Sequence, residues 1–179
     1  MIHVSSIFTD QPEVFKTPLQ EKVYTVLADL RIPFERVDTD EVITMEDCAA
    51  VNEKLHMDMV KTLFLCDRKK TAFYLFVTRG DKPFRSSDFS HALSVPRVSF
   101  APSELMESML GTTIGAATIF SILLPSAKQV RLVIDRDVYD SEYYGCSDGT
   151  TTGYMKIPTE RIMKDFLHEA GVAPNVIIL

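Results

Sequence analysis

The sequence has no tryptophan and only three cysteines among its 179 residues. Cys48, Cys66 and Cys146 are odd in number and far apart, and they form no C-x-x-C pair. No histidine stands at zinc-ligand spacing, so the sequence predicts neither a metal site nor a cofactor. Such sparse cysteines fit a protein of the reducing cytoplasm.

Long hydrophobic runs are also absent, because no stretch approaches the roughly 18 apolar residues of a membrane span. Residues 1–8 lack the basic start and the apolar run that a signal peptide requires. The sequence therefore predicts a cytoplasmic protein that is neither exported nor embedded in a membrane.

Motifs for covalent catalysis are missing as well. No serine or cysteine lies in a G-x-S-x-G or comparable nucleophile motif, and the four histidines have no partner arrangement. A catalytic triad is therefore not expected. Cys66 is expected in the core, whereas Cys146, between Gly145 and Ser147, is expected to be exposed; a thiol nucleophile there would lack a neighbouring base.

The residues that are present suit one globular domain. The chain is 46% hydrophobic and 25% charged, and its length fits residues 1–179 as a single domain with residues 1–16 as an N-terminal extension. Thr17, Pro18 and Gln20 form a capping box for a helix predicted over residues 18–30.

The later elements alternate between strands and helices. Two β-prone runs, 59–65 and 71–77, flank a charged tip at 67–70 and predict a hairpin of central strands. Caps and periodicity place the other elements. Strands are predicted over 34–37, 98–100, 130–135, 151–157 and 175–179, and helices over 86–93, 103–110 (capped by Ser103), 158–171 and from Thr44 onward.

Charge is unevenly distributed along the chain. The net charge is −6, yet residues 54–97 hold nine Lys or Arg against four Asp, a local net charge of +5 that leaves −11 elsewhere. Such a basic window can contact a few phosphates at one end of an RNA, or it can be an ordinary solvated hairpin face.

Lys61 is the most unusual single residue, because it lies within an apolar strand. Strand alternation puts Lys61, Leu63 and Leu65 on one face and Val60, Thr62 and Phe64 on the other. A lysine there either extends along the sheet edge into water or lines a pocket, and the strand pattern leaves both options open.

Two further segments have both a plain and a functional interpretation. The run of small residues from Gly111 to Thr118 either only caps a helix or directs backbone N–H groups into a cleft, where they would stabilise an oxyanion. Asp148 and Gly149 precede three threonines, which is typical of a turn that enters a strand and needs no function.

The order of these pieces resembles a known family. The run V-K-T-L-F-L-x-D-R-K-K is followed by R-G-D-K (79–82), V-S-F-A (98–101), L-G-T-T-I-G (110–115) and D-G-T-T-T (148–152). This order, over residues 17–179, is similar to the YbaK/prolyl-tRNA synthetase-associated editing domain family, above all its free-standing form that deacylates alanyl-tRNA(Pro).

The resemblance implies an α+β fold with a mixed, largely antiparallel, partly barrel-like sheet flanked by helices. It also implies hydrolysis of an aminoacyl-tRNA ester by a positioned water with help from substrate hydroxyls, without a metal or a protein nucleophile. Lys61 and Gly115 are the implied catalytic residues. The implied substrate-binding residues are Thr62, Gly111, Ile114, Ala116, Ala117, Thr118, Ile119, Phe120 and Asp148.

The implied partner is the aminoacylated end of tRNA(Pro), with a transient contact to prolyl-tRNA synthetase. The basic residues expected to contact tRNA are Arg68, Lys69, Lys70, Arg79 and Lys82. The sequence departs from the family at Thr62, where asparagine is usual, at Ile114 and Ile119, where prolines are typical, and at Gly145-Cys146, which replaces a His-Pro pair. Cysteinyl-tRNA(Pro) deacylation, a noncatalytic tRNA-binding or amino-acid-binding module, and an unrelated small-molecule pocket are the alternatives.

Overall fold

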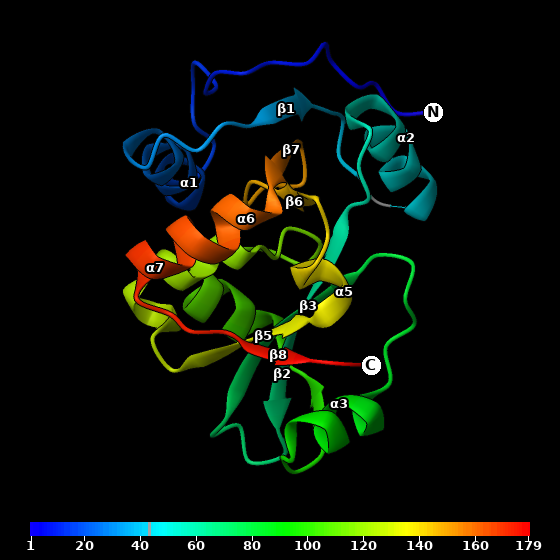
Figure 1. Ribbon diagram of the computed structural model, residues 1–179, viewed down its shortest axis with the longest axis vertical. Coiled ribbons are helices and arrows are strands. Elements are labelled where there is room, and N and C mark those ends of the chain that lie inside the picture. Colours follow the sequence, from blue (N-terminus) through cyan, green and yellow to red (C-terminus); the bar gives the residue numbers. More distant parts are fainter. Residues whose placement is uncertain (43) are drawn as a thin grey trace.

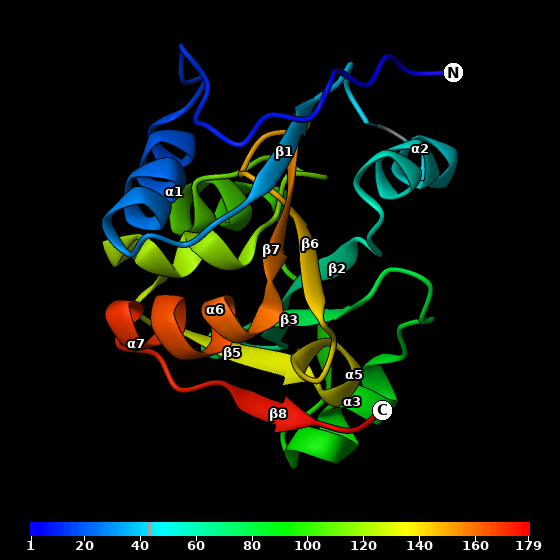
Figure 2. The same ribbon diagram turned by 45° about the horizontal axis from the view of Figure 1, so that its top comes forward.

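The computed structural model describes residues 1–42 and 44–179. Its described strands form a five-stranded sheet of order β4-β2-β3-β5-β8 and a three-stranded sheet of order β1-β7-β6, with helices packed around both (Figures 1 and 2). Four of the six strand pairings are antiparallel. The predicted mixed α and β architecture, with largely antiparallel sheets between helices, is confirmed.

The predicted hairpin forms the centre of the larger sheet. β2 (Val60–Asp67) and β3 (Phe73–Arg79) pair from Val60 opposite Arg79 to Cys66 opposite Phe73. β4 (Val98–Phe100) lies antiparallel to β2, while β5 (Val130–Asp135) and the edge strand β8 (Asn175–Ile177) run parallel to β3 and to β5. The predicted closing strand near the end of the sequence is therefore confirmed.

The smaller sheet contains β1 (Glu35–Asp38), β7 (Gly153–Pro158) and β6 (Tyr143–Ser147), all antiparallel. A parallel bridge between Gly145 and Met59, the residue just before β2, joins it to the larger sheet. Gly145 suits this crossing because a Cβ there would lie 2.6 Å from the Met57 sulfur. β6 was not predicted, and the expectation that Cys146 is exposed was wrong: it is 2% exposed because both faces of β6 are covered.

Helix caps explain where the first two helices begin. In α1 (Pro18–Asp29) the Thr17 hydroxyl accepts a hydrogen bond from the Gln20 backbone N–H at 3.0 Å. The predicted capping box is only half formed, because the Gln20 side chain accepts from Lys16 N–H and donates to Asp148 instead. The reciprocal box occurs at α2 (Met45–Leu55), between Thr44 and Asp47.

The remaining helices are short. The predicted helix before Gly111 forms as α4 (Ser103–Leu105) and a π-helical turn, η1 (Met106–Leu110), although Pro102 rather than Ser103 occupies its N-cap position. The last helix forms as α6 (Thr159–Arg161), η4 (Ile162–Phe166) and α7 (Leu167–Ala170) and ends at Gly171. The others are α3 (Ser86–Leu93), η2 (Ile119–Leu123), η3 (Pro125–Ala127) and α5 (Arg136–Tyr139).

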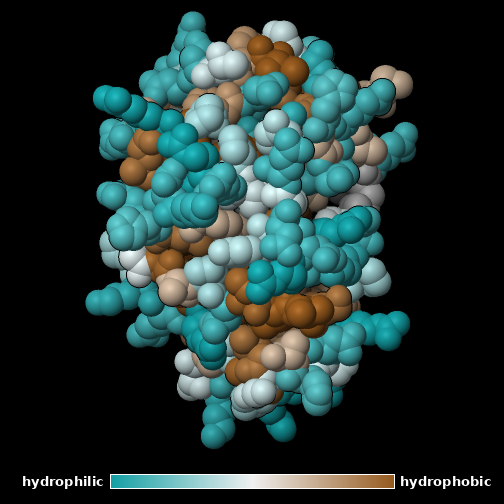
Figure 3. Space-filling view, in the orientation of Figure 1, coloured by the Kyte–Doolittle hydropathy of each residue, from teal (hydrophilic) through white to brown (hydrophobic). Residues whose placement is uncertain are grey.

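The two faces of the larger sheet belong to different cores. Phe64 packs in the main core with Phe120 and Phe166, whereas Leu65 packs with Phe89 of α3 on the other face. The surface in Figure 3 is mostly hydrophilic, with an apolar strip near β8. Within the described part of the chain, no helix is both long and apolar enough to cross a membrane.

Candidate functional site

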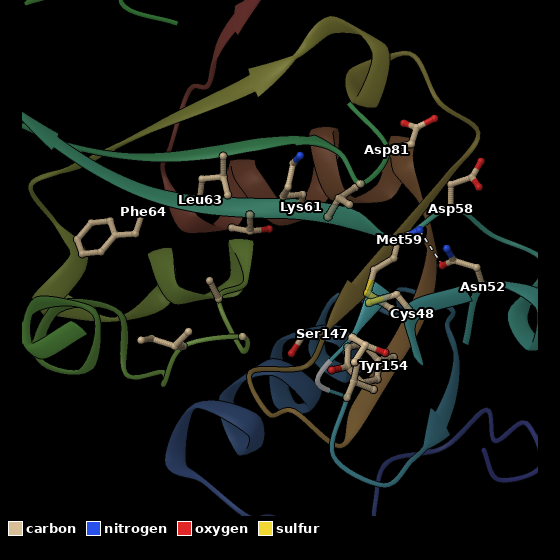
Figure 4. A pocket seen from close by; sticks show the side chains of 18 of the residues that line it. Cys48, Asn52, Asp58, Met59, Lys61, Leu63, Phe64, Asp81, Ser147 and Tyr154 are labelled. Atoms are coloured by element: carbon tan, nitrogen blue, oxygen red, sulfur yellow. Dashed lines mark hydrogen bonds between the residues drawn. The ribbon is translucent and has the colours of Figure 1, made fainter. Parts of the chain in front are cut away.

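A cavity of about 740 Å³ lies beside the first half of β2. β4 pairs only with Leu65, Cys66 and Asp67, so the preceding residues of β2 border this cavity instead of a strand. Its walls come from α2, from the loop after β3, from β4, from the small-residue loop (residues 111–118) and from the ends of β6 and β7 (Figure 4). The residues that line it include Cys48, Asn52, Asp58, Lys61, Thr62, Asp81, Ile114, Gly115, Ala117, Ser147 and Tyr154.

The cavity extends around the edge of β2 and reaches both of its faces. Leu63 packs against the hydrophobic cluster that contains Phe89, on the face of the sheet covered by α3. Phe64, on the other face, belongs to the main core with Ile119. Strand alternation then puts Lys61 on the α3 side and Thr62 on the side of the small-residue loop. In Figure 4 the Lys61 and Leu63 side chains point away from Ser147 and Tyr154. Lys61 and Gly115 therefore line one cavity from opposite faces of the strand.

Lys61 is half-buried, and its ammonium donates a hydrogen bond to the backbone carbonyl of Lys82. Among the residues that the structure describes, no carboxylate is close enough to form an ion pair with it. An ammonium has three N–H donors. Lys61 thus keeps hydrogen-bonding capacity that a ligand in the cavity could use.

The small-residue loop is held at both ends. Gly111 and Gly115 have φ values of 66° and 88°, which favour glycine. The Thr118 hydroxyl donates to the Ser147 carbonyl at 3.0 Å, and the Ser121 hydroxyl donates to the Leu110 carbonyl at 2.7 Å. These bonds fix the loop against β6 beside the cavity.

Not every predicted loop residue reaches the cavity. Ile114, Gly115 and Ala117 line it, and Ile114 is 73% exposed. Gly111 instead borders a second hollow of about 420 Å³ next to Lys16. The remaining predicted loop residues, Ala116, Thr118, Ile119 and Phe120, are buried and do not line the cavity.

Asp148 is buried and does not line the cavity. Its carboxylate accepts hydrogen bonds from the Gln20 amide and the Tyr24 hydroxyl, both at 2.9 Å, and from the hydroxyl and the N–H of Thr150. Gly153 leaves room for it, because a Cβ there would lie 2.2 Å from the carboxylate. In this geometry Asp148 joins α1 to the turn between β6 and β7.

Sequence reasoning missed the residues that α2 and the neighbouring loops contribute. The sequence predicts the Thr44 cap, but nothing in it connects Cys48, Asn52 or Tyr154 with Lys61. Asn52 is positioned by its own hydrogen bond from the Met59 N–H at 2.9 Å. Burial, together with the nearby Asp47 charge, raises the pKa of Cys48, and burial raises that of Cys146. Both thiols therefore stay protonated near neutral pH and are poor nucleophiles.

The five basic residues predicted to contact tRNA do not form one face. Arg68, Lys69 and Lys70 lie at the hairpin tip, whereas Arg79 and Lys82 lie at the other end of β3, near Lys61. Arg79 binds both oxygens of Asp81, and this hydrogen bonding lowers the pKa of Asp81. The Lys82 ammonium is bound by Asp135 and Asp137, so it is already paired.

Comparison with known proteins identifies the class. Residues 39–164 match the model of the aminoacyl-tRNA editing domain. The zebrafish (Danio rerio) prolyl-tRNA synthetase associated domain-containing protein 1 is 26% identical over 161 residues, which is 89% of this chain and 86% of that protein. The prolyl-tRNA editing protein ProX of Acetoanaerobium sticklandii is 26% identical over 119 residues, which is 66% of this chain and 73% of that protein.

Solved structures share the fold. The hypothetical protein APE2540 is 17% identical with a TM-score of 0.64, over 87% of this chain and 98% of that one. A protein described as a candidate trans-editing enzyme for prolyl-tRNA synthetase is 15% identical with a TM-score of 0.63, over 91% and 98%.

The chain belongs to the aminoacyl-tRNA editing domain family. It is an aminoacyl-tRNA deacylase, an enzyme that hydrolyses the ester between an amino acid and tRNA.

Proposed function

We propose that this deacylase edits alanyl-tRNA(Pro) in trans. The observation that carries the proposal is the cavity around the edge of β2, which Lys61 borders from one face while Thr62 and Gly115 border it from the other. The names of the relatives from Danio rerio and Acetoanaerobium sticklandii, which refer to prolyl-tRNA synthetase and to prolyl-tRNA editing, support the choice of tRNA.

The two faces suit the two parts of the substrate. The terminal ribose, or its phosphate, would bind the N–H donors that Lys61 has left, on the α3 side of β2. The aminoacyl ester would lie beside Gly115 and Ala117, where backbone N–H groups of the small-residue loop could stabilise charge on its carbonyl. Holding both parts fixes the ester relative to an attacking water.

The reaction proposed here uses a positioned water and a ribose hydroxyl of the substrate, without a protein nucleophile. The protonated state of the Cys48 and Cys146 thiols supports this choice. The water would add to the ester carbonyl, and the ribose oxygen would leave with a proton, giving free alanine and uncharged tRNA. Lys61 and the loop then act by position and charge.

An editing step is needed because a binding site for proline discriminates only weakly against smaller amino acids. A site selecting proline gains only about 1–3 kcal/mol of discrimination against a smaller apolar side chain, so a second site must remove what passes. Ile114, exposed at the cavity wall, is positioned to influence which acyl groups enter. Cysteinyl-tRNA(Pro) is the second candidate substrate, because Ile114 replaces a typical proline of the loop.

For tRNA contact, we retain Arg68, Lys69 and Lys70, which are exposed at the hairpin tip. Arg79 and Lys82 are weaker candidates, because each is already paired with carboxylates. A transient contact with prolyl-tRNA synthetase and a cytoplasmic location remain predictions.

The test is hydrolysis of alanyl-, cysteinyl- and prolyl-tRNA(Pro) by the wild type and by Lys61→Ala. The proposal expects multi-turnover release of alanine, little release of proline, and loss of release in the variant. A preference for cysteine would replace the substrate. Binding of tRNA without turnover of any ester would instead favour the noncatalytic module.

A further inference from the structure

We propose that Lys82 positions Lys61 and does not contact tRNA. Lys82 is fixed at two points: its ammonium binds one cluster of acceptors, while its backbone carbonyl accepts the hydrogen bond of Lys61. This inference rests on the proposed function only in taking Lys61 as the residue that acts on the substrate.

The ammonium end of Lys82 is saturated. Its nitrogen lies 2.7 Å from Asp135 Oδ2, 2.8 Å from Asp137 Oδ2 and 3.2 Å from the main-chain oxygen of Leu179. These three acceptors use all three N–H donors of an ammonium. A phosphate of tRNA would have to displace carboxylates already in place, which argues against a direct RNA contact.

The main anchor of this cluster is itself rigid. Asp135 is 1% exposed, accepts a hydrogen bond from the Thr78 hydroxyl at 2.7 Å, and caps α5 through the Asp137 N–H at 3.1 Å. Burial alone would lower the pKa of Lys82, but its bonds to Asp135 and Asp137 outweigh burial and raise it. Lys82 therefore stays charged at neutral pH.

The carbonyl of Lys82 meets β2, because it accepts the hydrogen bond of Lys61. Lys82 lies in the loop after β3, where its N–H bonds to the Arg79 carbonyl at 3.1 Å. Lys61 of β2 lies opposite Thr78 of β3, and the Thr78 hydroxyl donates to Asp135. β3 therefore links Lys61 to the acceptor that anchors Lys82. Anchoring the Lys82 side chain thus fixes the carbonyl that orients the Lys61 ammonium at the cavity.

The first experiment observes Lys61 directly and does not depend on activity. The Cε signals of Lys61 are recorded by NMR in ¹³C-labelled protein and assigned by their loss in Lys61→Ala. Lys82→Met keeps the backbone carbonyl and removes only the anchor, so we expect these signals to shift or broaden. Lys164→Met is the matched control, because Lys164 also has an ion pair but is 71% exposed and is not part of this cluster.

Asp137→Asn tests the same link with less risk to folding, because Asp137 is 51% exposed and Asp135 remains. A smaller change of the Lys61 signals in the same direction is expected. Unchanged Lys61 signals in both variants would overturn the positioning role, whatever the substrate of the enzyme proves to be.

The second experiment is a double-mutant cycle on deacylation. Lys82→Met should lower kcat/KM about tenfold to 100-fold, because misplaced groups cost rates of this order, and Lys82→Arg should restore most of it. In the Lys61→Ala background, Lys82→Met should change kcat/KM by less than about twofold, because the residue through which Lys82 acts is missing. An equal loss in both backgrounds would contradict the inference and indicate a direct role of Lys82.

Discussion

Lys61 and Asp148 are both charged residues in segments that the family resemblance marks as functional, yet the structure gives them opposite surroundings. Asp148 is buried with four hydrogen-bond donors around its carboxylate, whereas Lys61 borders a cavity and donates to one carbonyl. A saturated buried charge holds the fold together, while a charge with unused donors can bind a ligand. We therefore expect substitutions at Asp148 to change stability and substitutions at Lys61 to change activity.

The largest effect is expected on stability at Asp148. Asp148→Ala leaves the Gln20 amide and the Tyr24 hydroxyl buried without their acceptor, which should lower the free energy of unfolding by about 3 kcal/mol or more. Urea unfolding measures this change. Asp140→Asn, at an exposed i,i+4 pair, is the control and should change stability little. A near-neutral Asp148→Ala would show that the network is not structural.

Lys61 should behave in the reverse way. Lys61→Ala is expected to lower kcat/KM for aminoacyl-tRNA about 100-fold, because the charge that holds the terminal ribose or its phosphate, and so fixes the ester relative to the water, is lost. Its melting temperature should stay close to that of the wild type, because Lys61 makes one hydrogen bond at a half-buried site. Both quantities, the melting temperature and kcat/KM, should be measured on the same preparation of each protein. If Lys61→Ala lowered stability strongly and left kcat unchanged, Lys61 would be a structural residue like Asp148.

The hairpin tip should affect binding alone. Replacing Arg68, Lys69 and Lys70 together by alanine should raise KM about tenfold at low salt, leave kcat unchanged, and flatten the dependence of KM on salt. The measurement is KM at two salt concentrations, compared with the wild type. An unchanged salt dependence would place the tRNA contact on another surface.

The smallest effect concerns pH and the Lys82 cluster. The pKa of Asp137 is held below its ordinary 3.8 by Lys82, so its stabilisation is present above that value and is lost as the pH falls through the lowered pKa. The raised pKa of Lys82 means that its stabilisation is present below the ordinary 10.5 and is lost as the pH rises through the raised value. The melting-temperature difference between the wild type and Lys82→Met should therefore be larger at about pH 7 than at about pH 3.

Local rules were enough for much of the fold. The residues predicted for α3, β4 and β5 match the observed spans, because helical periodicity and β-prone residues act within a few positions of the chain. β6 was missed because Tyr143–Ser147 is short and contains a glycine that is needed only by the crossing at Met59. The need for glycine at position 145 comes from a segment distant in the sequence, so no local sequence pattern predicts it.

The site was harder to predict for the same reason. Lys61 and the small-residue loop could be proposed from their motifs, but Asn52 and Tyr154 reach the cavity only through tertiary packing. The basic window at residues 54–97 predicts one charged surface, but the length of β2 and β3 separates the hairpin tip from Arg79 and Lys82. Charge counted along a sequence does not reveal which cations are already paired.

The role of Lys61 is tested by the rate of alanine release from alanyl-tRNA(Pro) by the wild type and by Lys61→Ala, with prolyl-tRNA(Pro) as the comparison substrate. We expect selective turnover of the alanyl ester by the wild type and a loss of about 100-fold in a variant that is still folded. Equal rates in the two proteins would contradict the role given to Lys61 and to its cavity.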